Sequence, residues 1–165
     1  MAFWGITVLD ATDLAILDSL QANARTSNAD IARKLGMAPS AILDRIRKLE
    51  TRGVLQGYSA RIDPGAVGLG LTAFILVRTE ERVGAGTIGQ ALARIPEVLE
   101  VHHVAGEDCY LVKARVRDTE SLSGLLRERF GRLKGVRSTR STIVLQTVKE
   151  SQSLPLEGEG ARRDG

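Results

Sequence analysis

The stretch G36-M-A-P-S-A-I-L-D-R-I-R-K-L-E50 reads as a short, basic, amphipathic helix. Three aliphatic residues recur at the i, i+4, i+7 spacing of one helix face: Ile42, Ile46 and Leu49. At about 100° per residue, three polar residues fall on the opposite side: Ser40, Asp44 and Arg47. Ala41 and Lys48 flank them, and Arg45 lies at the shoulder, where its alkyl stem can follow the core while its head reaches outward. The pattern predicts a surface helix that keeps its aliphatic side inward.

Two further helical patterns precede this stretch. The first is capped at Asp10, and the second begins at Ser27 and stops at Gly36, a favourable C-terminal glycine. Pro39 then opens the third helix, a position that proline tolerates well. Two capped helices separated from the third by a tight break predict a helix-turn-helix domain over residues 10–54.

In helix-turn-helix geometry, the early outward residues of the last helix enter a major groove, and cations further along meet phosphate. We therefore expect one group of residues to face the bases: Ser40, Ala41, Asp44 and Arg47. A second group is expected to hold phosphates: Arg45, Lys48 and Arg52. Ser27 and Asn28 add contacts from the start of the preceding helix. The expected partner is double-stranded DNA.

Asp44 is unusual on such a surface, because DNA phosphates repel a carboxylate unless it accepts a hydrogen bond from cytosine N4. In that case Asp44 selects a sequence by rejecting other bases. The alternative is an ordinary surface ion pair with Lys48, four residues later, worth about 0.2–0.5 kcal/mol. The sequence leaves both interpretations open, and two helices joined by a short break are also common in proteins that do not bind DNA.

The second half of the chain changes from helical periodicity to strand-like runs near residue 63. Strand, helix, strand, strand, helix and strand follow over residues 70–150, which is the βαββαβ order of ferredoxin-like domains. Residues 55–69 read as a linking strand and a turn-rich linker. The expected fold is α+β, with an N-terminal three-helix, winged-helix-like domain joined to a C-terminal ferredoxin-like domain.

The composition of the 165 residues fits a globular chain, with 43% hydrophobic residues and a net charge of +3. Residues 28–62 carry seven basic and three acidic residues, a weak indication of a polyanionic partner. The single cysteine, Cys109, cannot form an internal disulfide, which favours a cytoplasmic location. No apolar run approaches the ~20 residues that span a bilayer, so no membrane partner is expected. Residues 1–9 read as an N-terminal extension rather than a signal peptide, and residues 151–165 as a disordered tail.

Four long runs carry a resemblance to a known family. The first half contains L-D-A-T-D-L-A-I-L-D-S-L-Q-A-N-A-R-T-S-N-A-D-I-A-R-K-L-G and D-R-I-R-K-L-E-T-R-G-V-L-Q-G-Y-S-A-R-I-D-P. The second half contains P-E-V-L-E-V-H-H-V-A-G-E-D-C-Y-L-V-K-A-R-V and G-V-R-S-T-R-S-T-I-V-L. Over residues 9–150 the chain thereby resembles the Lrp/AsnC (leucine-responsive, feast/famine) family of transcriptional regulators. The resemblance implies a DNA-binding helix-turn-helix and a ligand-responsive βαββαβ domain that forms a homodimer and commonly an octamer of four dimers.

The resemblance also implies an effector, an amino acid or a similar small metabolite, bound against the turn between the two central strands at a contact between dimers. Carried onto this chain, the implied residues are Ala105, Gly106, Glu107, Asp108, Cys109 and Tyr110, with Thr139 and Ser141 on the last strand as weaker candidates. Gly106 lets a ligand approach the backbone closely. The G-E-D run is also an ordinary hairpin turn, and hydroxyl residues on a strand often only face water.

Two departures from the family pattern affect this transfer. Met37-Ala38 stands where relatives usually begin the recognition helix with Leu-Ser, and losing a serine cap typically costs about 1 kcal/mol. In the turn, Cys109 replaces the second aspartate of the usual Thr-Gly-Asp-aromatic-Asp run. That aspartate is a natural partner for an ammonium group, and Glu107 or Asp108 is the expected substitute.

Catalysis is not expected from the ferredoxin-like half. Its titratable candidates are His102, His103 and Cys109. Successive strand residues point to opposite faces, so the two histidines cannot share a metal or a substrate, and Cys109 lies about 10 Å along the strand from His103. We therefore expect no catalytic residue, no metal and no cofactor. The alternative to a DNA-binding regulator is a small-molecule-sensing oligomeric module without DNA-binding function. Such a module would be stabilised by its ligand but would show no salt-dependent binding to DNA.

Overall fold

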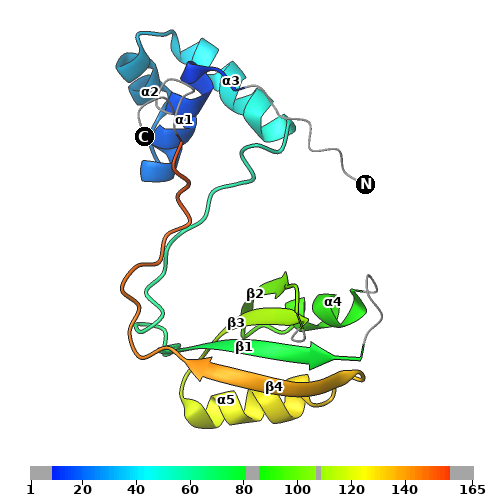
Figure 1. The fold of residues 1–165 in the computed structure, drawn as a ribbon. Helices are drawn as coiled ribbons and strands as arrows, with labels where there is room; N and C mark the ends of the chain where they lie inside the picture. The colour runs from blue at the N-terminus through cyan, green and yellow to red at the C-terminus, as the bar shows by residue number, and fades with distance from the viewer. Residues whose placement is uncertain (1–8, 81–85, 107–108, 157–165) are drawn as a thin grey trace, which may run out of the picture. The chain divides into compact units, whose positions relative to one another are not determined.

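The computed structural model describes residues 9–80, 86–106 and 109–156 (Figure 1). The chain divides into two compact units. One comprises the residues up to Arg61 together with those from Glu150 onward, and the other comprises Ile62–Lys149. Across the described residues, no helix combines the length and the apolar character that crossing a bilayer requires.

The N-terminal unit contains three helices: α1 (Ala11–Ala22), α2 (Asn28–Leu35) and α3 (Pro39–Thr51). The predicted caps are confirmed, because the side chain of Asp10 accepts the Asp13 N–H at 2.8 Å and that of Ser27 accepts the Asp30 N–H at 3.1 Å. Gly36 ends α2 at a φ of 66°, a left-handed conformation that glycine adopts without steric cost. All three helices supply buried residues to one core: Ile16, Leu17, Leu20, Ile31, Ala32, Ile42, Ile46 and Leu49.

No strand forms over residues 55–69, where the sequence predicted a linking strand and a turn-rich linker. Val54 and Leu55 instead fold back on the end of α3, and their N–H groups donate to the Leu49 carbonyl at 2.9 and 3.1 Å. Both side chains pack against the core of the three helices. A strand requires a hydrogen-bonded neighbour. Within the described chain, Val54 and Leu55 are instead hydrogen-bonded to the end of α3 and packed against the helical core.

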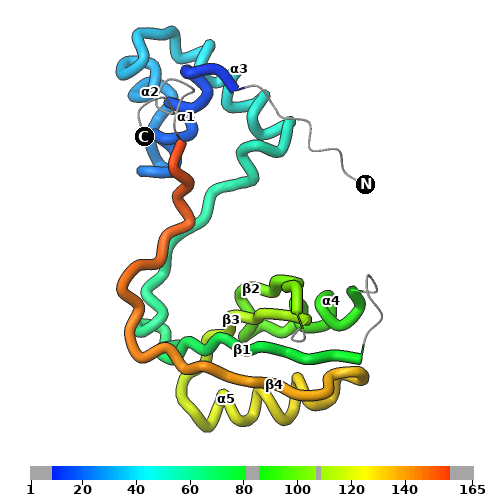
Figure 2. The backbone as a smooth tube through the Cα atoms, in the orientation of Figure 1, coloured from blue at the N-terminus to red at the C-terminus, as the bar shows by residue number. Residues whose placement is uncertain are grey.

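The C-terminal segment returns to the N-terminal unit, although its composition predicted disorder from residue 151 (Figure 2). The side-chain amide of Gln21 in α1 pairs with the backbone of Leu154. Gln21 Nε2 donates to the Leu154 carbonyl at 3.1 Å, and the Leu154 N–H donates to Gln21 Oε1 at 2.7 Å. Leu156 is half-buried against the helical core. The rest of the predicted tail, from residue 157, lies outside the described residues, as do residues 1–8 of the predicted N-terminal extension.

The second unit contains the elements β1 (Leu71–Thr79), α4 (Thr87–Ala93), β2 (Val98–His103), β3 (Tyr110–Val116), α5 (Thr119–Leu125), a π-helical turn η1 (Leu126–Phe130) and β4 (Val136–Ile143). The strands pair antiparallel in the order β2-β3-β1-β4. This is the βαββαβ, ferredoxin-like arrangement that the sequence predicted, and the α+β fold is confirmed.

One face of this sheet is covered by α4 and α5, and the other face is open. Ile75 of β1 and Val112 of β3 pair with each other and are completely buried in a core that includes Leu92 of α4 and Leu122 of α5. Because side chains alternate along a strand, Phe74 of β1 points to the opposite face, where it is 36% exposed. The second unit therefore presents a partly apolar sheet face that no helix of the described chain covers.

Acid should destabilise the protein through its helix caps. The Asp13 N–H lowers the pKa of the Asp10 carboxyl, and the Ser121 N–H, which donates to Asp118 at 2.7 Å, lowers the pKa of Asp118. Since these pKa values are lower in the folded than in the unfolded state, the stabilisation is complete above about pH 4 and is lost as the pH falls through the folded-state values. Thermal unfolding followed by circular dichroism should show this loss. Asp118→Asn keeps a capping oxygen but cannot titrate, so a variant with an unchanged acid response would contradict the assignment.

Removing the contact of the C-terminal segment should loosen α1. Gln21→Ala deletes both amide hydrogen bonds, and each bond of this kind is worth about 1 kcal/mol. We expect faster amide hydrogen exchange in α1 for Gln21→Ala and for a chain that ends after Glu150. Leu154→Ala is the matched control, because the side chain of Leu154 is 67% exposed and only its backbone makes the contact. Equal exchange in all these variants would show that the segment does not support the helix.

Candidate nucleic-acid interface and effector site

Helix α3 presents the polar side that its sequence pattern predicted. Ala38 precedes the helix without a side-chain capping bond, and Pro39 occupies the first turn, where its missing N–H costs nothing. Three residues of α3 are buried: Ile42, Ile46 and Leu49. Five expected DNA-contacting residues are exposed: Ser40, Asp44, Arg47, Lys48 and Arg52. Ala41 is half-buried, so its side chain lies at the edge of the exposed surface.

Asp44 lies on the exposed side of α3 without the partner that the surface-pair interpretation expects. Asp44 is exposed and, within the described part of the chain, makes neither an ion pair nor a hydrogen bond. Lys48, which the i, i+4 spacing would allow as a partner, forms no ion pair with it. The carboxylate is therefore available to an external donor.

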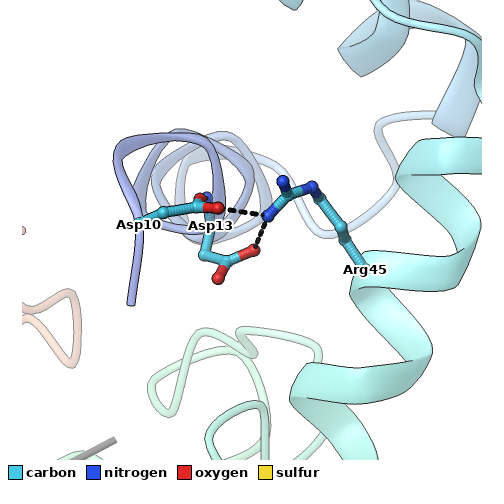
Figure 3. Close-up of polar contacts among 3 residues, drawn as sticks. All are labelled: Asp10, Asp13 and Arg45. Atoms are coloured by element: carbon cyan, nitrogen blue, oxygen red, sulfur yellow. Dashed lines mark hydrogen bonds and ion pairs between the residues drawn. The ribbon is translucent and has the colours of Figure 1, made fainter. Parts of the chain in front are cut away.

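Arg45 has two partners within its own protomer (Figure 3). Its Nη1 atom donates to Asp10 Oδ2 and to Asp13 Oδ1, both at 2.7 Å. The hydrogen bonds to Asp10 and Asp13 raise the pKa of the Arg45 guanidinium, and the pKa of Asp10 is lowered first by the Asp13 N–H and then by Arg45. The sequence predicted that Arg45 holds a phosphate, whereas the structure places it between two carboxylates of α1.

A hollow of about 470 Å³ lies beside Arg45, lined by Asp13, Met37, Ala41, Asp44, Arg45, Lys48, Leu49 and Arg52.

At the start of α2, the hydroxyl of Ser27 donates to Asp30 Oδ2 at 2.6 Å and also caps the helix, so its hydrogen-bonding capacity is largely used. Asn28 is half-buried in the first turn. The exposed cations next to the hollow, Lys48 and Arg52, therefore offer more to a polyanion than the α2 terminus does.

The turn between β2 and β3 spreads the predicted effector residues over different environments. Ala105 and Gly106 are exposed, and Gly106 has a φ of 125°, which favours glycine. Cys109 is half-buried, and Glu107 and Asp108 lie outside the described residues. Tyr110 is 4% exposed and belongs to the core.

Tyr110 packs against Gly89 of α4, where an added Cβ would lie 2.7 Å from its ring. The absence of a side chain at Gly89 lets the helix approach β3 closely. Tyr110 therefore belongs to the core that supports the turn and does not line an exposed surface next to it.

The last strand brings the predicted Thr139 to the same end of the sheet as the turn. Thr139 pairs with Val77 of β1, and Val77 pairs with Tyr110 of β3. Ser141 lies two residues further along and pairs with Ile75. Both hydroxyl residues are exposed.

A second hollow, of about 710 Å³, lies where β1 ends and β4 begins. Its lining carries both signs of charge and two hydroxyls: Arg78, Thr79, Glu80, Arg137 and Ser138. Arg137 Nε pairs with Glu80 Oε1, and Thr79 Oγ1 is buried without a hydrogen-bond partner among the described residues. Sequence analysis did not identify this group, because the residues converge only through the register of β1 and β4.

The two histidines face opposite sides of the sheet, as their sequence positions predicted. His102 Nε2 lies 3.3 Å from Glu100 Oε2, and Glu100 also pairs with Lys113 at 3.0 Å. His103 instead stacks on Tyr110, with ring centroids 5.2 Å apart. The hydrogen bond from Lys113 lowers the pKa of Glu100. This arrangement brings no pair of catalytic groups together at His102 and His103.

Comparisons with known proteins give a family match in each half of the chain. Residues 9–50 match the AsnC-type helix-turn-helix domain, and residues 72–154 match the Lrp/AsnC ligand binding domain. The leucine-responsive regulatory protein of Escherichia coli (strain K12) is 36% identical over 152 residues, covering 90% of this chain and 92% of that protein. The helix-turn-helix match favours a DNA-binding regulator over a sensor without DNA-binding function.

Solved structures give the same result over about 90% of the chain. A transcriptional regulator from Neisseria meningitidis in complex with L-methionine is 33% identical with a TM-score of 0.84, covering 90% of this chain and 97% of that chain. A feast or famine regulatory protein from M. tuberculosis complexed with L-methionine is 37% identical with a TM-score of 0.82, covering 89% and 99%. The chain therefore belongs to the Lrp/AsnC family of transcriptional regulators.

Proposed function

We propose that this regulator binds DNA as a homodimer that places two copies of α3 in successive major grooves, at half-sites about one helical turn (~34 Å) apart. The observation that supports this most directly is the division of α3 into two sides. One side is aliphatic and buried, and on the exposed side the Asp44 carboxylate forms no ion pair or hydrogen bond with the described residues. Four residues face the bases: Ser40, Ala41, Asp44 and Arg47. Lys48 and Arg52 contact phosphates, and Ser27 and Asn28 add contacts from the start of α2.

Asp44 supplies selectivity in this arrangement. Its carboxylate accepts a hydrogen bond from the N4 amino group of cytosine and is repelled at positions without such a donor. Because Asp44 has no ion-pair partner among the described residues, its full charge faces the groove. The DNA sequence that this protein prefers therefore contains a cytosine at the position that Asp44 meets.

The effector is an amino acid or a chemically similar metabolite, as the L-methionine complexes of two similar regulators suggest. An amino acid carries one carboxylate and one ammonium group, and the hollow at the end of β1 offers Arg137 to the first and Glu80 to the second. The neighbouring turn, with Ala105 and Gly106 exposed, completes the site when a second dimer approaches, together with Glu107, Asp108 and Cys109 of the same turn and Thr139 and Ser141 of β4.

Assembly follows from the surfaces that the second unit leaves open. The uncovered sheet face with Phe74 is suited to pairing with a second copy, and contacts between dimers build the octamer. An effector bound at a contact between dimers favours one assembly state over another and shifts their populations. The protein acts in the cytoplasm and without catalysis.

Asp44→Ala should change which DNA sequence is preferred. We expect a loss of about 1–3 kcal/mol in discrimination at one base pair, together with stronger binding to unrelated DNA because a repulsive charge is gone. Sequence preference can be measured by selection from a random DNA pool followed by competition binding. Asp18→Ala removes the same charge from an exposed position on α1 and is the matched control. Identical preferences in all three proteins would contradict a base-contacting role for Asp44.

An amino acid should stabilise the protein through the hollow at the end of β1. A thermal-shift screen of the L-amino acids, including L-methionine and L-leucine, should give a hit whose stabilisation approaches about 2.7 kcal/mol at one hundred times its dissociation constant. Arg137→Ala should abolish the response, whereas the exposed Arg132→Ala should retain it. Sizing with and without the hit then tests the assembly shift. If no amino acid and no chemically similar metabolite stabilises the protein, the effector proposal is overturned and the DNA proposal is unaffected.

A further inference from the structure

Arg45 differs from the neighbouring cations of α3 in what its charge contacts. Lys48 and Arg52 are exposed and form no ion pair within the described part of the chain. Arg45 is only 31% exposed at its side chain and donates to two carboxylates through the same nitrogen. The three residues lie along one flank of the helix. Their spacing alone therefore does not show which of them can contact a phosphate.

The charge balance around Arg45 opposes a role as a phosphate contact. One guanidinium stands between Asp10 and Asp13, so the three side chains together carry a formal charge of −1. A phosphate that approached Arg45 would meet this negative excess at short range. Asp13 is also 12% exposed at its side chain, and a carboxylate with so little access to water requires a cation beside it.

The carboxylate of Asp10 is held in place by α1 itself. Asp10 caps the helix, and its Oδ1 accepts the Asp13 N–H at 2.8 Å, which leaves Oδ2 for Arg45. Negative side chains are favoured at this end of a helix because its free N–H groups carry a positive partial charge. Arg45 therefore binds one acceptor that the helix cap holds and a second that is largely buried, and its two hydrogen bonds are directional in a way that aliphatic contacts are not.

We propose that Arg45 is a positioning residue for DNA recognition, which fixes the rotation of α3 against the start of α1 through Asp10 and Asp13 and does not contact phosphate. The proposal deepens the DNA-binding function proposed above and rests on it. Aliphatic packing determines which side of α3 is buried, and within the small range of rotations that keeps this side buried the ion pairs select one. That rotation determines where Asp44 and Arg47 point.

Salt dependence separates the two roles of a cation. We would measure binding of the full-length protein to a DNA fragment selected by the wild type, over a series of salt concentrations. Lys48→Met should reduce the slope of log affinity against log salt by about one per bound protomer, as expected for a lost phosphate contact. Arg45→Met, which keeps an apolar stem of similar reach, should leave the slope unchanged. A reduction equal to that of Lys48→Met would overturn the proposal.

Sequence preference separates positioning from simple stabilisation of the fold. At a temperature where circular dichroism shows each variant folded, Arg45→Met should lower the ratio of specific to non-specific affinity by about tenfold, a loss similar to that of one mismatched base pair. An unchanged ratio would overturn the proposal. If Arg45→Met alone does not fold, Arg45→Met combined with Asp13→Asn removes the uncompensated carboxylate, and the same two outcomes apply. A wild-type protein without sequence preference would instead overturn the proposed function, so the two failures are distinguishable.

Discussion

The burial of one aliphatic stripe on α3 is the constraint on which the remainder of the N-terminal unit depends. Ile42 and Leu49 are almost inaccessible to water, and their spacing fixes which side of the helix faces α1 and α2. Burying such a side chain contributes about 1.5–3 kcal/mol relative to leaving it exposed. A rotation of α3 that exposed this stripe would lose that free energy. The opposite side, with Asp44 and Arg47, therefore faces solvent. The exposure of this polar side is thus a consequence of where the core must be.

Features with local causes were predicted from the sequence, and features with distant partners were not. The cap at Asp10 and the helix end at Gly36 depend on neighbouring residues, and the structure confirms both of them. The return of the C-terminal segment depends instead on the match between the Gln21 amide and the backbone of Leu154, which lie 133 positions apart. Composition describes such a segment as disordered because it contains no information about an acceptor elsewhere in the chain.

The effector region follows the same division. The hairpin itself and the opposite directions of its two histidines follow from strand alternation. The hollow with Glu80 and Arg137 exists because β1 and β4 pair in one particular register, and no local pattern marks either residue. Its position in the family motif placed Tyr110 among the ligand-facing residues. The ring of Tyr110 lies in the core instead, because Gly89 has no side chain and leaves space for it.

The position of Arg45 shows how a capping requirement in one helix governs a cation in another. Asp10 and Asp13 occupy the start of α1 because free N–H groups there favour acceptors and negative charge. The core places the shoulder of α3 against this same helix end, and the cation at the shoulder then pairs with both carboxylates. Lys48, one turn further along α3, remains clear of both. The basic residues of a recognition helix are therefore not equivalent, and their number alone overestimates how many of them reach the DNA backbone.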